Sequence, residues 1–265
     1  MSFLALPSPV PQSLVHGRRV QDCAEPTAEM SRSRVGYDLN MFSSDRDAGT
    51  KSARTRAQLR EIALRSFRER GYDATTIRRI ATEAGVSVGT TNYHFASKNH
   101  LVQELYLDVQ ARHRVAVLPE LDTTDDLIER LGLVYRAGLD ELTPYHAHAG
   151  EFVSAALAPK SDINPLSTQS APARDITEAL FSEAVAGARH GLPDDIARGL
   201  PPALFLGHLL LALFWVYDSS PGQATTRRLL ERGLGLLKLA LPLARLPLVR
   251  KPIADLLALI GEVRV

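Results

Sequence analysis

The sequence predicts an all-α protein with an N-terminal three-helix helix-turn-helix module and a larger C-terminal helical domain. Apolar residues recur at helical spacing over much of the chain after residue 50. No stretch alternates apolar and polar residues as a half-buried strand does. Two short helical segments are joined by a turn that contains glycine, as in a helix-turn-helix unit. The expected divisions are an arm over residues 1–50, the module over 51–100 and the helical domain over 101–265.

Composition sets broad limits. The chain has 265 residues and is 45% apolar, which is enough for a substantial core. Its only cysteine, Cys23, excludes an internal disulfide framework and suits a reducing cytoplasm. The first residues show no basic segment ahead of an uninterrupted apolar one, so no secretory signal is expected there. The predicted location is cytoplasmic.

The positive charge is concentrated in one block. Residues 51–100 hold ten Lys or Arg and four acids, although the net charge of the chain is only +1. A compact basic block on a nearly neutral chain indicates a polyanionic partner. The alternative is a solvated helix face rich in arginine. The arm over residues 1–50 has scattered prolines and two arginine groups, and these either touch nucleic acid or are solvated: Arg18, Arg19, Arg32 and Arg34.

The first predicted helix spans residues 53–70. One of its faces is apolar or small at helical spacing, and its other face carries arginine and glutamate. Gly71 is expected to end this helix as a C′ glycine does. The residues predicted to face inward are Leu59, Ile62, Ala63, Ser66 and Phe67.

The second predicted helix spans residues 75–84, with Thr75 as its N-cap. Gly85 closes it, Val86 anchors the turn, and Ser87 caps a third helix from Val88 to Phe95. In a helix-turn-helix unit this third helix lies in the major groove of DNA, with its N-terminal residues at the base edges.

The stretch "GVSVGTTNYHFASK", residues 85–98, contains no acidic residue, as a segment that approaches phosphate requires. Its short polar side chains suit bases or phosphates, and Tyr93 and His94 suit donation to phosphate. Lys98, in the first turn of the next helix, opposes the helix dipole, so a nearby anion is its expected partner. The positions expected to contact DNA are Arg56, Thr76, Arg78, Ser87, Val88, Gly89, Thr90, Thr91, Asn92, Tyr93, His94 and Lys98.

Residues 55–101 resemble the DNA-binding domain of the TetR family of bacterial transcriptional regulators. The matching landmarks are Phe67, Gly71, Thr76, Ile80, Ala81, Gly85, Val86, Ser87, Tyr93, Phe95 and Lys98. The resemblance implies a C-terminal helical domain that binds a small effector and forms a homodimer. It also implies that two C-terminal helices of each subunit build a four-helix interface.

The remainder of the chain is expected to be helical. A Pro/Ser loop over residues 158–172 interrupts it. The predicted helices cover residues 98–117, 124–142, 145–158, 171–189, 194–218 and 223–241.

Two segments near the C-terminus are strongly apolar. Residues 203–217 are apolar nearly all round but are shorter than the roughly 20 residues of a membrane span. Residues 226–241 carry leucines at a period close to 3.6. Burial against a second copy is the expected explanation, and a large monomeric core is the alternative. The predicted interface residues are Leu206, Leu210, Phe214, Leu230, Leu234, Leu237 and Leu241.

Evidence for a ligand site is weaker, because aromatic residues and a lone histidine on an apolar helix also occur in ordinary cores. The candidates are His148, Phe152, Phe181, Phe205, His208 and Trp215. His148 and Glu151 have the i,i+3 spacing of metal ligands but His146 does not, so no metal site is expected.

The leading hypothesis is a homodimeric repressor that binds a palindromic double-stranded DNA operator and is released by a small apolar effector. No cofactor and no membrane association are expected. One alternative is a DNA-binding regulator controlled by a protein partner. An enzyme is the other, although the sequence has no phosphate-binding glycine loop, nucleophile elbow or spaced metal triad.

Overall fold

The computed structural model describes residues 51–158, 160–189 and 191–262, and these contain helices but no strand. The all-α prediction is confirmed. Cys23 and the arginines of the arm lie outside the described residues. The helices are α1 (Lys51–Ala74), α2 (Ile77–Glu83), α3 (Val88–His94), α4 (Lys98–Leu121), α5 (Leu127–Leu142), α6 (Ala149–Ala156), α7 (Ala171–Ala186), α8 (Asp194–Tyr217), α9 (Ala224–Ala240) and α10 (Pro247–Glu262), with 3₁₀ turns η3 (Thr143–His148), η4 (Pro221–Gln223) and η5 (Leu241–Arg245).

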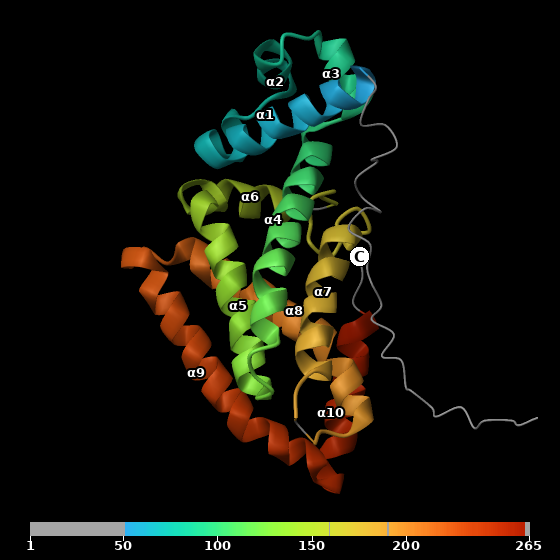
Figure 1. The fold of residues 1–265 in the computed structure, drawn as a ribbon, viewed down its shortest axis with the longest axis vertical. Coiled ribbons are helices and arrows are strands. Elements are labelled where there is room, and N and C mark those ends of the chain that lie inside the picture. The colour runs from blue at the N-terminus through green and yellow to red at the C-terminus, as the bar shows by residue number, and fades with distance from the viewer. Residues whose placement is uncertain (1–50, 159, 190, 263–265) are drawn as a thin grey trace, which may run out of the picture. The chain divides into compact units, whose positions relative to one another are not determined.

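Helices α1, α2 and α3 form a small module at one end of the described chain (Figure 1). The predicted inward face of α1 is buried. It packs with Ile80 of α2 and with Phe95, which follows α3. Gly71 turns the chain near the end of α1 with φ of +79°, a conformation that glycine adopts without strain.

The cap of α2 differs from the prediction. Thr76, not Thr75, is the N-cap, and its side chain accepts a hydrogen bond from the backbone N–H of Arg79. Thr75 is fully buried. Its hydroxyl donates to the carbonyl of Gly71 at 2.7 Å and lies 2.9 Å from the Ser66 hydroxyl. Thr75 therefore closes the α1–α2 turn from inside, where a hydroxyl has only protein partners.

Helix α4 connects the module to the C-terminal domain and runs through the boundary expected at residue 100. Ser97 caps it by accepting from the backbone N–H of His100. Helix α4 packs against α5 and α7, and α8 packs against α7 (Figure 1). The core between them contains Leu131, Leu180 and Phe181.

The prediction for residues 145–158 is replaced by two elements, the 3₁₀ turn η3 and the short helix α6. Both lie against α1 (Figure 1). Tyr145 of η3 is buried in the same cluster as the residues of the module. The C-terminal domain thus supports the module through η3 and α6 as well as through α4.

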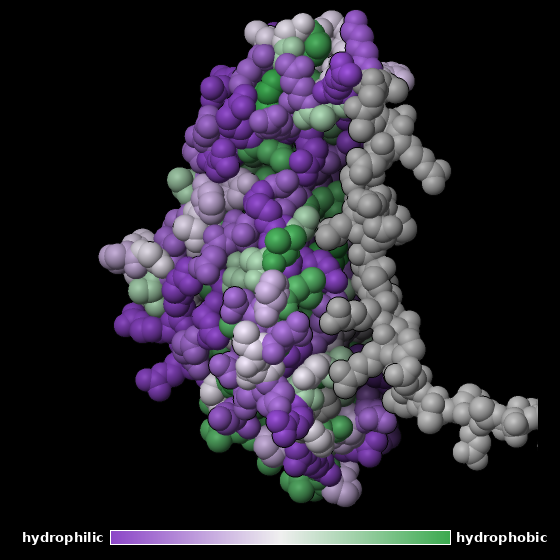
Figure 2. Space-filling view, viewed as in Figure 1, coloured by the Kyte–Doolittle hydropathy of each residue, from purple (hydrophilic) through white to green (hydrophobic). Residues whose placement is uncertain are grey.

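Helix α10 lies beyond residue 241, where the predicted helices end. Pro247 starts the helix, where its missing N–H costs nothing, and Pro252 removes only one donor. Helix α10 packs closely on α8, since a Cβ at Gly199 would lie 2.9 Å from the Cβ of Leu257. Hydrophobic residues reach the surface at the lower end of the view, where α9 gives way to α10 (Figure 2).

Helix α8 has 24 residues and is the one helix of the described chain that is long and apolar enough to cross a membrane. Its bounds agree with the helix predicted over residues 194–218, and Pro201 and Pro202 lie inside it. It packs against α7 and α10, and residues such as Leu204 and Trp215 are buried there. These contacts are those of a core helix.

Candidate nucleic-acid interface

Helix α3 is exposed on the side of the module that faces away from the C-terminal domain (Figure 1). Tyr93 is 81% exposed, and Val88, Gly89 and Asn92 are also exposed. The Ser87 side chain caps the helix by accepting from the backbone N–H of Thr90 at 3.0 Å. The turn from Ala84 to Ser87 and the helix itself contain no acid. The helix can therefore approach an anionic surface.

Thr91 was expected to contact DNA, and the structure places it elsewhere. It is fully buried, and its hydroxyl donates to the carbonyl of Ser87. At helical spacing one face of α3 must pack on the module, and Thr91 is on that face. Gly89 is exposed, and a Cβ there would meet only the Ser87 hydroxyl, at 3.6 Å, so no contact within the protein requires glycine.

Helix α2 adds exposed arginines next to α3. Arg78 and Arg79 are both exposed, and the sequence reasoning named only Arg78. The Thr76 hydroxyl already accepts from the backbone N–H of Arg79, at 3.2 Å. It can still donate its own proton to an anion. Hydrophilic residues predominate over α1 in the space-filling view (Figure 2).

Arg56 and Lys98 have partners within the protein. Arg56 is paired with Glu104, and its guanidinium carbon lies 4.9 Å from the centre of the Phe95 ring. The Lys98 ammonium donates to the carbonyl of Tyr72 at 3.0 Å and lies 3.6 Å from the centre of the Tyr72 ring. Partial burial lowers the pKa of Lys98. One donor of Lys98 joins α4 to α1, and a phosphate partner for its remaining donors stays a prediction.

Part of the basic block is neutralised internally. Arg60 pairs with Glu104 and Asp108, and Arg65 pairs with Glu83. A residue count therefore overstates the charge available to a polyanion. His94 is half-buried, with its ring centre 5.1 Å from that of Tyr93. Outward-facing side chains near α3 include those of Thr76, Arg78, Arg79, Ser87, Val88, Asn92 and Tyr93, with the partly buried Thr90 beside them.

Two family models match the chain and between them cover most of the described residues. The model described as "Bacterial regulatory proteins, tetR family" matches residues 59–105. The model described as "Tetracyclin repressor-like, C-terminal domain" matches residues 130–251. The chain belongs to the TetR family. This membership places it with DNA-binding regulators rather than enzymes.

Similar proteins agree with the family. The "HTH-type transcriptional repressor KstR2" of Mycobacterium tuberculosis is 41% identical over 107 residues, which are 39% of this chain and 51% of that protein. KstR2 of Rhodococcus jostii is 37% identical over 95 residues, covering 34% and 46%. The matched part of this TetR-family chain thus spans about half the length of these curated relatives.

Solved structures share the fold at low identity. A TetR-family regulator from Streptomyces coelicolor has a TM-score of 0.54 at 17% identity, covering 78% of this chain and 89% of that one. A TetR-family regulator from Syntrophomonas wolfei also scores 0.54, at 16% identity, covering 70% and 95%.

The candidate ligand residues of this TetR-family chain fall into two groups. Phe181, Phe205, His208 and Trp215 are buried in the C-terminal domain. Phe152 instead packs against Phe67 and Tyr72 of the module, and His148 lies beside Glu151. The six candidates therefore do not lie together, and their role in ligand binding stays a prediction.

His208 is the unusual member of the buried group. Its ring is stacked near that of His113, with centres 6.1 Å apart, and lies beside the contacting rings of Tyr135 and Phe181. Among the described residues its Nδ1 has no hydrogen-bond partner. Burial, with a smaller contribution from His113, lowers the pKa of His208 to about 3. The ring is therefore neutral and can accept or donate one further hydrogen bond.

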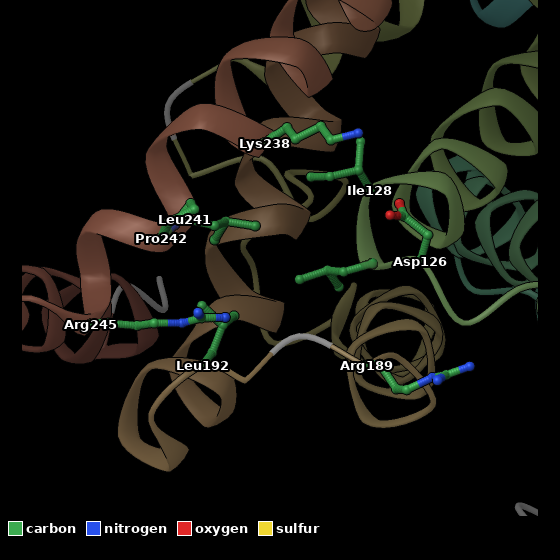
Figure 3. A pocket seen from close by; sticks show the side chains of 9 residues that line it. Asp126, Ile128, Arg189, Leu192, Lys238, Leu241, Pro242 and Arg245 are labelled. Carbon is green, nitrogen blue, oxygen red and sulfur yellow. The ribbon is translucent and has the colours of Figure 1, made fainter.

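Two hollows of the described surface involve none of the six ligand candidates. One, of about 110 Å³, lies at the far end of the C-terminal domain. Lys238 and Arg245 border it on one side, and Asp126 and Ile128 border it on the other (Figure 3). The other, of about 300 Å³, lies between α1, α4 and η3 and is lined largely by arginines. Most ligand pockets measure about 300–1,000 Å³ and are apolar, so neither hollow resembles the expected site.

The predicted interface residues also divide. Leu210 and Phe214 are exposed, at 68% and 44%, and Leu206, Leu237 and Leu241 are partly exposed. Leu230 and Leu234 are corrected, because each is only 6% exposed where α9 packs on α5. The sequence could not show which face of α9 meets α5. Exposed apolar residues that the prediction missed are Leu213, Tyr217, Leu229, Leu236 and Leu239.

Proposed function

We propose that this chain is a transcriptional repressor that binds a palindromic double-stranded DNA operator as a homodimer, with α3 in the major groove. The observation that carries the proposal is the exposed, acid-free face of α3, with Tyr93 81% exposed beside Arg78 and Arg79 of α2. The repressor names of the relatives support regulation by repression. As a DNA-binding regulator it acts in the cytoplasm.

A homodimer is supported by a stripe of exposed apolar side chains on the C-terminal half of α8. Leu210, Leu213, Phe214 and Tyr217 have the i, i+3, i+4, i+7 spacing of one helix face. Monomeric proteins seldom expose large contiguous apolar patches. A dimer with two-fold symmetry would present its two DNA-binding modules to half-sites separated by one helical turn of DNA, ~34 Å, or a multiple of it.

Selection of bound fragments from a random DNA pool tests the proposal. A palindromic consensus is expected, and recovery of no consensus would exclude sequence-specific binding. Arg78→Ala is expected to weaken binding and to alter base preference, whereas Tyr93→Ala should weaken binding to all sequences alike. Arg198→Ala, at an exposed arginine on α8, is the charge-matched control and should leave the affinity unchanged. The affinity should fall steeply with salt, because bound cations displace counterions from DNA.

The controlling signal is proposed to be a small apolar effector that opens the core around His208 and satisfies its Nδ1. The unpaired nitrogen supports this, because an unsatisfied buried polar atom costs about 1–3 kcal/mol. The burial of Phe181, Phe205 and Trp215 in one core cluster favours the second candidate, control by a protein partner. Thermal-shift screening of apolar compounds separates them. An effector at this site should stabilise the unaltered protein but not His208→Leu, whereas a partner-controlled regulator should respond to no compound.

A further inference from the structure

The C-terminal end of α1 is held by a carboxylate from α6. Glu151 Oε2 accepts a hydrogen bond from the backbone N–H of Asp73 at 2.8 Å. The other oxygen of Glu151 lies 3.1 Å from His148 Nδ1. The Asp73 N–H is the largest cause of a lowered pKa of Glu151, and His148 acts in the same direction. Glu151 is therefore ionised at neutral pH, and it accepts from a backbone N–H that follows the break in α1 at Gly71.

Gly71 makes room for this contact. Its φ of +79° turns the chain so that the following N–H groups point toward α6. A Cβ at this position would lie 2.7 Å from His148 Nδ1 and 2.8 Å from the carboxyl carbon of Glu151. Both distances are shorter than real Cβ contacts. Glycine is therefore required here for two independent reasons, the backbone conformation and the space taken by the carboxylate.

Phe152, the next residue of α6, is inserted into the module. Its ring is 5.6 Å from that of Phe67 and 5.7 Å from that of Tyr72, edge-on in both cases. Lys98 covers Tyr72 and binds its carbonyl. Helix α6 thus contacts the module through one charged and one aromatic side chain.

The same support continues to α8. His146 of η3, the turn that leads into α6, lies with Nε2 3.0 Å from the carbonyl of Trp215 and its ring 4.6 Å from the indole. Trp215 is buried on α8, and its neighbour in the chain, Phe214, belongs to the exposed apolar stripe. A movement of the C-terminal half of α8 therefore meets η3 and α6 before it reaches α1.

We propose that Glu151 and Phe152, called here the α6 latch, fix the orientation of the DNA-reading module on the C-terminal domain. Glu151 is a positioning residue that acts on α3 through the end of α1. The latch is also the connection through which a change at η3 or α8 alters the direction in which α3 faces. This inference rests on the proposed DNA-binding function and names the residues that regulate it.

Spacing discrimination tests the latch without a known effector. The full chain is titrated with its selected palindrome and with versions in which one base pair is added or removed between the half-sites. A module held in one orientation discriminates among these spacings, whereas a loosened module tolerates them. Glu151→Gln should reduce the ratio of affinities for the correct and altered spacings by about threefold or more, because a charge-assisted hydrogen bond is replaced by a weaker neutral one. The salt dependence should stay unchanged, since no phosphate contact is removed.

Two control substitutions change residues that are not part of the α6 latch. Ser154→Ala alters an exposed residue of α6, and Glu120→Gln removes a carboxylate at the far end of α4. Both should keep the spacing ratio of the unaltered protein. An unchanged ratio in Glu151→Gln, with DNA selection intact, overturns the latch alone. If the unaltered protein selects no sequence, the proposed function fails and the latch fails with it.

A stability cycle gives a second readout that does not depend on DNA. Gly71→Ala should lower the melting temperature, because of both the positive φ and the overlap with the carboxylate. In a Glu151→Ala background the overlap with the carboxylate is gone and only that with His148 remains, so the same substitution should lower the melting temperature by clearly less. Equal losses in the two backgrounds would show that the carboxylate does not occupy this position, and the latch would be refuted.

Discussion

Replacement of Arg130 by methionine should cause a large loss of stability. Arg130 is 6% exposed, and its guanidinium donates only to backbone carbonyls. It binds Thr124 at 2.9 Å, Glu183 at 2.9 Å and Ala184 at 2.7 Å, and it also binds Leu121. These bonds hold the C-terminal ends of α4 and α7 together, where helices have carbonyls without internal partners.

The size of the effect follows from those contacts. Methionine keeps much of the apolar stem but removes four hydrogen bonds. At about 1 kcal/mol net for each bond, the free energy of unfolding should fall by about 3–5 kcal/mol. For a chain of this size about 2–4 °C accompanies each kcal/mol, so the melting temperature should fall by about 6–20 °C.

Arg136→Met is the matched control, on the same helix. Arg136 makes a 2.8 Å ion pair with Glu231, and both side chains are well exposed. Such a pair contributes at most about 1 kcal/mol. Both variants should be compared at one protein concentration, because a dimer's melting temperature depends on it. Equal losses in the two variants would refute the role assigned to the buried guanidinium.

Three further outcomes are expected. Asp218 accepts hydrogen bonds from Ser220 and Thr226, which hold its pKa below the usual range. Asp218→Asn should therefore lower the melting temperature at neutral pH, and the difference from the unaltered protein should shrink as the pH falls below about 4. A difference that does not depend on pH would contradict this. Because the pKa of His208 is lowered in the folded protein, this histidine binds a proton below about pH 6.5 only in the unfolded chain. The free energy of unfolding should therefore fall with acid by up to about 1.4 kcal/mol per pH unit. His208→Leu should make the melting temperature depend less on pH between about 6.5 and 4. Leu210→Glu should shift light scattering from dimer to monomer at micromolar concentration, whereas a monomer before mutation would refute the stripe as an interface.

The helix-turn-helix module was largely predictable, because local chemistry determines it. Glycines at residues 71 and 85 and the caps at Ser87 and Ser97 are short-range signals, and the inward face of α1 follows from helical period. The partners of Lys98 were not predictable. Its contacts with Tyr72 join positions 26 residues apart, and only the packing of α4 on α1 brings them together.

The C-terminal domain shows the same division. Helical period placed most of its helices, but the leucines of α9 could not be assigned to the core or to the surface without knowledge of α5. Phe152 read as an apolar wall of a ligand site, although it belongs to the module, because η3 directs α6 toward α1. Glu151 was considered only as a metal ligand. Its partner is a backbone N–H, which carries no sequence signal.

The docking of α10 at Gly199 determines how much of α8 remains open to another molecule. The chain's last helix packs on the N-terminal half, whereas the exposed apolar stripe lies on the C-terminal half, which contacts η3. In a symmetric dimer the contact between subunits would lie near the two DNA-binding modules, and not at the far ends of the C-terminal domains. The distance from this contact to each DNA-binding module is then short. A small tilt at the contact therefore moves the modules with little bending of the helices between them.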